Sequence, residues 1–258
     1  MKRAAAAIFL LCFLALTPSF AQTRQLTLPA AEIYELRIFC GAGALYLTNA
    51  DWQNSIRVWA EIETENQIQL DNQEFSEKYV DLSLERNGPR AILKSTLKKN
   101  LLNSVGQLLN PVEAKIDLTI EIPEGIDLFI DDGSGPIHIQ HFKGHLVVKD
   151  GSGAITLEDV TGNVTVSDGS GKILMEGIRG NVEVKDGSGS IEIDKIRGDV
   201  RVTDGSGEIS IQHVDGYVTV MDESGEININ DISGNVMIRS SGSGEVNVER
   251  VKGQITKY

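Results

Sequence analysis

The stretch Asp150-Gly-Ser-Gly-Ala-Ile-Thr-Leu-Glu158, followed directly by Asp159-Val-Thr-Gly-Asn-Val-Thr-Val-Ser167, is one unit of a repeat that fills the second half of the chain. The Asp-Gly-Ser-Gly that opens the unit occurs five times at intervals of 18 residues, from Asp132 to Asp204. An altered sixth copy begins at Asp222, and a seventh unit follows a one-residue insertion near Ser240. A fixed period of this length is typical of solenoid proteins.

Each unit divides into two halves of nine residues, with glycine at the fourth position and apolar residues at the sixth and eighth. Apolar residues two apart have the periodicity of a β-strand, and the recurring Gly and Asp are turn residues. We therefore expect an all-β fold, a β-solenoid (β-helix) whose 18-residue coils each contribute two short strands and two tight turns. In one coil, the residues expected to point inward are Ile155, Leu157, Val160, Val164 and Val166.

The glycines at the fourth position of each half have a backbone role in this interpretation. We expect them to adopt positive φ or to let neighbouring coils approach closely at the corner, where a side chain would block the approach. These structural turn residues are Gly153, Gly162, Gly171, Gly180, Gly189 and Gly198.

The chain divides into three expected segments: a signal peptide at 1–21, irregular N-terminal β coils or a β cap at 22–130, and the regular solenoid of about seven repeats at 131–258. Lys2-Arg3, the apolar run from Ala4 to Leu16 and the small-x-small triplet before Gln22 predict secretion. The apolar run, about 13 residues, is too short to span a membrane. The mature protein is therefore expected to be exported.

Between 22 and 130 the period is lost, but patches of alternation persist, and we favour one continuous architecture over two domains. The patches are Leu36/Ile38/Cys40, Leu45/Leu47, Ile56/Val58/Ala60/Ile62, Val80/Leu82/Leu84 and Ile116/Leu118/Ile120/Ile122. Segment 63–78 is polar and predicts a loop or short helix. Segment 98–111 has leucines at helical spacing, which indicates a helix packed against the solenoid or, alternatively, a partner-binding loop.

At the C-terminal end the last coil has no evident cap, so its open edge could pair with another molecule and give an oligomer.

Composition limits the partners. The chain has 24 basic and 37 acidic residues, and the net charge of −13 disfavours nucleic acid and anionic lipid surfaces. Removal of the signal leaves one cysteine, Cys40, whose apolar neighbours predict a buried thiol rather than a reactive one. An exported chain without disulfides suggests a bacterial periplasmic, outer-surface or secreted protein.

The repeated aspartate is the sharpest candidate site. Stacked at the same turn, Asp150, Asp168, Asp186 and Asp204 would lie about 5 Å apart, and like charges this close repel. Either each carboxylate accepts hydrogen bonds from its own Gly-Ser-Gly turn, which we favour, or cations lie between the turns. The calcium-binding nonapeptide repeat has its aspartate at a position that is apolar here, so that mechanism is absent.

Other polar groups do not converge. His138, His141 and His145 are expected to point in different directions, which argues against a zinc site. The serines of each Asp-Gly-Ser-Gly recur without a paired histidine, and carboxylate pairs such as Asp131/Asp132 or Glu192/Asp194 are interpreted as solvated surface. We therefore expect no catalytic residues, no metal ligands and no cofactor.

A family resemblance adds to this. The alternating strand Ile116-Asp-Leu-Thr-Ile-Glu-Ile-Pro-Glu-Gly-Ile-Asp-Leu128, followed by the Asp-Gly-Ser-Gly repeats, resembles the bacterial family of adhesin-like β-solenoids, long labelled a domain of unknown function, and its relative the head-GIN adhesin-like domain. The resemblance implies an exported, non-catalytic solenoid and supplies no ligand or active site.

The function expected from sequence is a surface or periplasmic scaffold or binding module, with a glycan or an envelope protein as partner. Two alternatives remain: a polysaccharide-active enzyme built on a β-helix, and a calcium-stabilised structural protein. The enzyme would need one coil with a non-repeating acid/base cluster. The structural protein would need cations on the aspartates.

Overall fold

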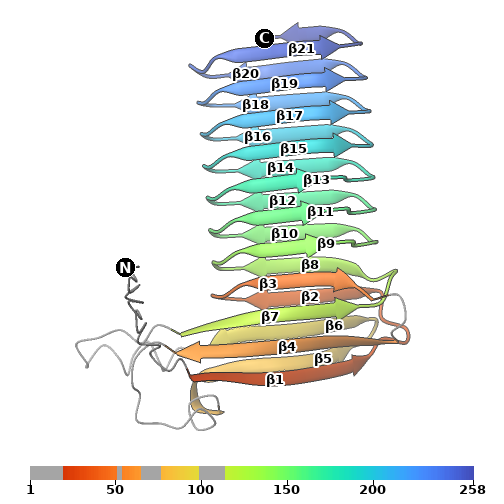
Figure 1. The fold of residues 1–258 in the computed structure, drawn as a ribbon, viewed down its shortest axis with the longest axis vertical. Helices are drawn as coiled ribbons and strands as arrows, with labels where there is room; N and C mark the ends of the chain where they lie inside the picture. The colour runs from red at the N-terminus through yellow and green to blue at the C-terminus, as the bar shows by residue number, and fades with distance from the viewer. Residues whose placement is uncertain (1–19, 51–53, 65–76, 99–113) are drawn as a thin grey trace, which may run out of the picture.

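The computed structural model describes residues 20–50, 54–64, 77–98 and 114–258, which form a tower of stacked strands in two 11-stranded sheets (Figure 1). The first sheet, here sheet A, has the order β1 (Phe20–Pro29), β4 (Ser55–Thr64), β7 (Ala114–Ile122), β3 (Leu45–Asn49), β9 (Ile137–Gln140), β11 (Ile155–Glu158), β13 (Ile173–Glu176), β15 (Ile191–Ile196), β17 (Ile209–Val214), β19 (Ile227–Ile232) and β21 (Val246–Val251). The second, sheet B, has the order β22 (Ile255–Lys257), β20 (Val236–Ser241), β18 (Val218–Asp222), β16 (Val200–Asp204), β14 (Val182–Asp186), β12 (Val164–Asp168), β10 (Leu146–Asp150), β8 (Asp127–Asp132), β2 (Glu35–Cys40), β6 (Arg90–Leu97) and β5 (Val80–Asn87).

From β8 onward the chain alternates between the two sheets, and each strand pairs in parallel with the strand 18 residues away. Ile155 pairs with Ile173 in sheet A, and Val164 pairs with Val182 in sheet B. The inward side chains of one coil, Ile155, Leu157, Val160, Val164 and Val166, are each at most 1% exposed. The predicted β-solenoid of about seven turns is thus confirmed, and its core is a set of aliphatic ladders between the sheets.

The N-terminal strands form the base of the tower and continue both sheets (Figure 1). The coil made by β2 and β3 stacks directly on β8 and β9 with parallel pairing. Below it the pairing changes, because β1, β4 and β7 are antiparallel neighbours, as are β5 and β6. All five patches of alternation predicted in this region are strands. Strands β1 and β6 were not predicted.

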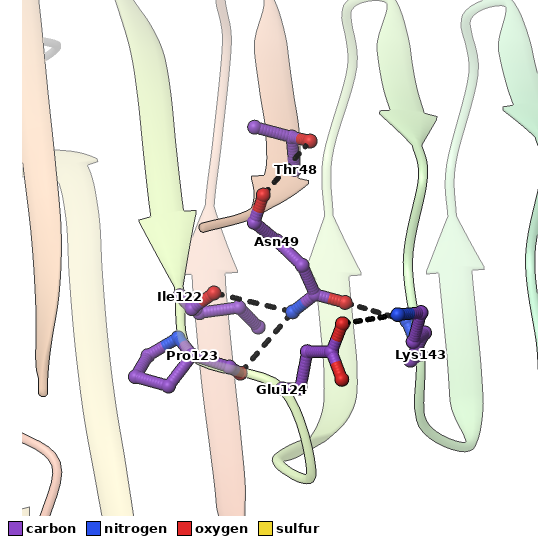
Figure 2. Close-up of polar contacts among 6 residues, drawn as sticks. All are labelled: Thr48, Asn49, Ile122, Pro123, Glu124 and Lys143. Atoms are coloured by element: carbon purple, nitrogen blue, oxygen red, sulfur yellow. Dashed lines mark hydrogen bonds and ion pairs between the residues drawn. The ribbon is translucent and has the colours of Figure 1, made fainter. Parts of the chain in front are cut away.

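A polar junction joins the base to the regular coils (Figure 2). The Asn49 side chain donates hydrogen bonds to the carbonyl oxygens of Ile122 (3.2 Å) and Pro123 (3.1 Å), and its Oδ1 accepts one from the Lys143 backbone N–H (2.6 Å). The Lys143 ammonium also pairs with the Glu124 carboxylate. One asparagine therefore connects the end of β3, the end of β7 and the turn before β10.

The expected insertion near Ser240 appears as a register shift. Val220 pairs with Ile238, but Met221 pairs with Ser240, so the extra residue is absorbed within β20 at Arg239. Of the other predicted segments, residues 65–76 and 99–113 lie outside the described residues, as do residues 1–19 of the predicted signal peptide. Within the described part, no helix is long and apolar enough to cross a membrane. The three-segment division remains a prediction.

Candidate functional site

Six aspartates form a vertical column inside one corner of the solenoid. Each is the last residue of a sheet B strand, and each pairs in register with the next: Asp132, Asp150, Asp168, Asp186, Asp204 and Asp222, here the aspartate column. These six residues are 0–8% exposed. The interpretation of Asp132 as solvated surface is therefore wrong, because the inward alternation of the strand continues through its last residue.

Five of the six column aspartates cap their own turns; the exception is Asp132, whose two carboxylate oxygens have no hydrogen-bond partner among the described residues. The Ser152 backbone N–H donates to Asp150 Oδ1 at 3.2 Å, and the Ser170 N–H donates to Asp168 Oδ1 at 3.1 Å. The same bond recurs at Asp186, Asp204 and Asp222. This arrangement satisfies a turn amide that would otherwise face the corner.

The second carboxylate oxygen is the unusual atom. Oδ2 of each column aspartate is buried without a hydrogen-bond partner among the described residues. Burial, reinforced by the neighbouring carboxylates, raises the pKa of Asp150 to about 6 and that of Asp204 to about 6. Burial likewise raises the pKa of Asp132 to about 6 and raises the pKa values of Asp168, Asp186 and Asp222. Because a buried carboxylate without a cation is costly in its charged form, the column binds protons more readily than free aspartate does.

Uncharged residues close both ends of the column. Ser241 pairs with Asp222 at the upper end. At the lower end Cys40 is a half-buried free thiol, and burial together with the Asp132 carboxylate raises its pKa. Cys40 in turn pairs with Ser95, which is 2% exposed. None of the ion pairs among the described residues involves a column aspartate, so no lysine or arginine offsets the repulsion between the carboxylates.

The predicted turn glycines lie where the coils approach most closely. Gly171 has φ 147°, and a Cβ built on it would overlap the carbonyl oxygen of Gly153 in the coil below. The other predicted positions also have positive φ and a glycine carbonyl from the coil below in the way: Gly153, Gly162, Gly180, Gly189 and Gly198. The predicted alternatives, positive φ and close approach, therefore occur together.

The sequence did not lead us to predict a left-handed backbone position at the opposite corner. Asp159 (φ 52°), Lys195 (φ 58°) and His213 (φ 53°) open the second half of their coils in this conformation. Gly177 occupies the equivalent position with φ 73°. That single glycine is the signal that could have identified the position, because non-glycine residues rarely adopt this conformation.

The three histidines point to different surroundings. His138 stacks on Tyr46 on the outer face of sheet A, with ring centroids 5.0 Å apart. His141 lies 3.4 Å from the Asp159 carboxylate at a turn, and His145 Nδ1 accepts a hydrogen bond from the Asn163 backbone N–H. No group of His, Cys, Asp and Glu side chains in the described ranges is arranged to hold a metal ion.

A groove of about 480 Å³ lies on the outer face of sheet B, across β12, β14, β16 and β18. One wall is a row of residues that each immediately precede a strand, and we call it the turn row: Asn163, Asn181, Asp199 and Tyr217. The other wall is a row of outward strand residues, here the strand row: Thr165, Glu183, Arg201 and Thr219. The valines between the rows are buried, so their backbone forms the floor of this outer groove.

Comparison with known proteins identifies the family. The model of the Toastrack DUF4097 family matches residues 49–257, and the chain belongs to that family. The solved structure of a putative lipid binding protein from Parabacteroides distasonis ATCC 8503 is similar with a TM-score of 0.51 and 19% identity, over 92% of this chain and 96% of that one. A putative adhesin from the same organism has a TM-score of 0.48 and 12% identity, over 93% and 97%. A comparison with curated proteins finds no match.

The adhesin-like β-solenoid resemblance drawn from the sequence is thus supported at the level of the family. At 19% identity the likeness to the lipid binding protein shows the fold alone. The relation to the head-GIN adhesin-like domain remains a prediction.

Proposed function

We propose that this protein is an exported, non-catalytic binding module that presents the outer faces of its solenoid at the bacterial surface or in the periplasm. The observation that carries the proposal is the repetition of its polar chemistry. The Asp-turn-Ser unit of Asp150 and Ser152 recurs with the same hydrogen bond through five coils. A catalytic centre needs a singular constellation of groups, whereas a repeated surface suits recognition of an extended partner.

The family and the N-terminal sequence support the same function. Structures with related folds are named as putative adhesins or as a putative lipid binding protein, and those names describe binding rather than turnover. The basic start and apolar run of residues 1–21 support export. Partners of the envelope, either a glycan or a protein, fit this location.

The test is a binding screen with residues 22–258 against immobilised glycans and purified envelope components. We expect saturable binding to at least one of them and no release of reducing ends from any polysaccharide. Turnover abolished by one point substitution would instead support the alternative of a polysaccharide-active enzyme. Absence of any binding in the screen would contradict the proposal.

The calcium-stabilised alternative has its own test. A ligand that binds only the folded state raises the melting temperature. Because five of the six column aspartates already accept a bond from their own turns, we expect millimolar calcium to leave the melting temperature unchanged. A rise that chelator reverses and Asp168→Asn weakens would favour the alternative.

A further inference from the structure

The outer groove has walls that are held in place before any ligand arrives. In the turn row, Asn163 Oδ1 accepts a hydrogen bond from the Asn181 backbone N–H at 3.0 Å. Asn181 Oδ1 accepts from the Asp199 N–H at 2.9 Å, and Asp199 Oδ1 accepts from the Tyr217 N–H at 2.8 Å. Each side chain is thus clamped to the coil above it. A preorganised wall lowers the entropy that binding has to overcome.

The clamps leave hydrogen-bonding groups free. They use only the amide oxygens of Asn163 and Asn181, so both Nδ2 groups are without a partner in the described part of the chain. Arg201 is exposed, lies in the middle of the strand row and has no ion pair among the described residues. Amide donors and a guanidinium facing one groove can bind several hydroxyl or carbonyl oxygens at once.

One residue breaks the polar character of the turn row. Tyr217 is 57% exposed at the upper end of the outer groove, where the coils below have Asn181 and Asp199. An exposed tyrosine ring offers a flat apolar face beside a polar hydroxyl. This combination suits a ligand that is itself both apolar and rich in hydroxyl groups.

The charges and the lining exclude other ligand classes. The walls combine Arg201 with Glu183 and Asp199, and the whole chain has a net charge of −13, so a polyanion would be repelled. A lipid tail needs an apolar channel, and the valine side chains of the floor are turned into the core. The outer groove lies on the face of a sheet, whereas an extended peptide that adds a strand needs a sheet edge.

We propose that the outer groove binds an uncharged oligosaccharide laid along the axis of the tower, with Tyr217 stacked on one sugar ring. This inference rests on the proposed binding function and assigns its site and ligand class. The groove crosses four coils, about 14 Å at the strand spacing of a β-sheet, which suits a short chain rather than a single sugar. Asn163, Asn181 and Arg201 hydrogen-bond to the hydroxyl groups.

Isothermal titration with unbranched neutral hexasaccharides of glucose, mannose, xylose and N-acetylglucosamine tests the proposal. We expect at least one of them to bind and Tyr217→Ala to weaken that binding at least tenfold. The matched control is Tyr34→Ala, which removes a similarly exposed tyrosine (65%, against 57% for Tyr217) outside the outer groove and should leave the affinity unchanged. Arg201→Gln should weaken binding, whereas Arg239→Gln, exposed on the same sheet beyond the groove, should not. Melting temperatures of all four variants verify folding.

The outcomes separate this inference from the proposed function. If a hexasaccharide binds equally well to Tyr217→Ala and the wild type, the site is wrong and the binding function stands. If only acidic polysaccharides or only an envelope protein bind, the ligand class is wrong. If neither the hexasaccharides nor any component of the wider screen binds, both proposals fall.

Discussion

At the level of single residues, the buried aspartate combines a useful bond with a costly charge. Asp168 Oδ1 accepts a hydrogen bond from the turn, while Oδ2 is buried without a hydrogen-bond partner among the described residues. Asparagine can keep the first interaction and removes the charge, so we expect Asp168→Asn to be neutral or stabilising at pH 7. Asp168→Ala loses the cap and should lower the free energy of unfolding by about 0.5–2 kcal/mol, by analogy with lost helix caps. Urea denaturation measures both changes. Ser167→Ala, at the exposed neighbouring position, is the control, and a destabilised Asn variant would contradict this account.

The glycine corner gives a second prediction at this scale. Ala at position 171 would place its Cβ against the Gly153 carbonyl and require a strained φ, and we expect Gly171→Ala to cost at least about 2 kcal/mol of stability. Gly41→Ala is the control, because its Cβ would meet nothing within 4 Å. Equal melting temperatures of the two variants would show that the corner can relax.

How far these residues could be predicted differs from one to the next. The 18-residue period is enough to predict that the aspartates stack on one another. The turn sequence Asp-Gly-Ser-Gly is enough to predict that each carboxylate accepts a hydrogen bond from its own turn. The direction of the side chain follows from alternation, because Val164, Val166 and Asp168 are successive inward positions; treating Asp168 as a turn residue obscured this. Its raised pKa could not be read from sequence, since it depends on how completely the corner excludes water.

At the level of the strand, alternation decides which substitutions matter. Val184 on β14 is fully buried and stacks between Val166 and Val202, whereas Glu183 beside it faces outward. We expect Val184→Asp to bury an unpaired charge and to cost about 4 kcal/mol or more, enough to unfold several coils. Glu183→Gln should change stability by less than about 0.5 kcal/mol. Circular dichroism melts compare them, and similar losses would show that the inward frame is misassigned.

The base of the tower shows where strand prediction from sequence fails. Strands β2, β3, β4, β5 and β7 carry clear alternation and were predicted. In β6 the inward series Ala91, Leu93, Ser95 is short and ends on a polar residue, so its signal is weak. The antiparallel pairing of β1 with β4 links segments about 35 residues apart, and nothing local encodes it. The outer groove depends in the same way on the arrangement of four coils and is invisible in any one of them.

For the whole molecule, the aspartate column makes stability depend on pH. Burial raises the pKa of Asp132, Asp150 and Asp204 to about 6, above the value near 3.9 of an unfolded chain. The folded state therefore binds more protons between these values. The stability from these protons is complete below about pH 4 and is lost as the pH rises through about 6. We expect the melting temperature to be higher at pH 5 than at pH 8.

A variant with Asn at 150, 168 and 186 tests the origin of this dependence. It should show a smaller difference in melting temperature between pH 5 and pH 8, because three of the proton-binding carboxylates are gone. Glu158→Gln, at an exposed position, should leave the difference intact. An unchanged difference in the triple variant would place the dependence elsewhere.

The register shift between Val220 and Met221 bears on how the length of this solenoid can change in evolution. The ladders on either side of it continue, since Ile229 pairs with Val248 beyond the extra residue. A solenoid that accommodates a coil with one extra residue can also accommodate a complete additional unit. A duplicated unit contributes its own strands, turns and inward aliphatic residues. Gain or loss of one 18-residue unit would therefore lengthen or shorten the protein by about 4.8 Å without a new core having to evolve. The height of the tower is a trait that selection can adjust in equal steps.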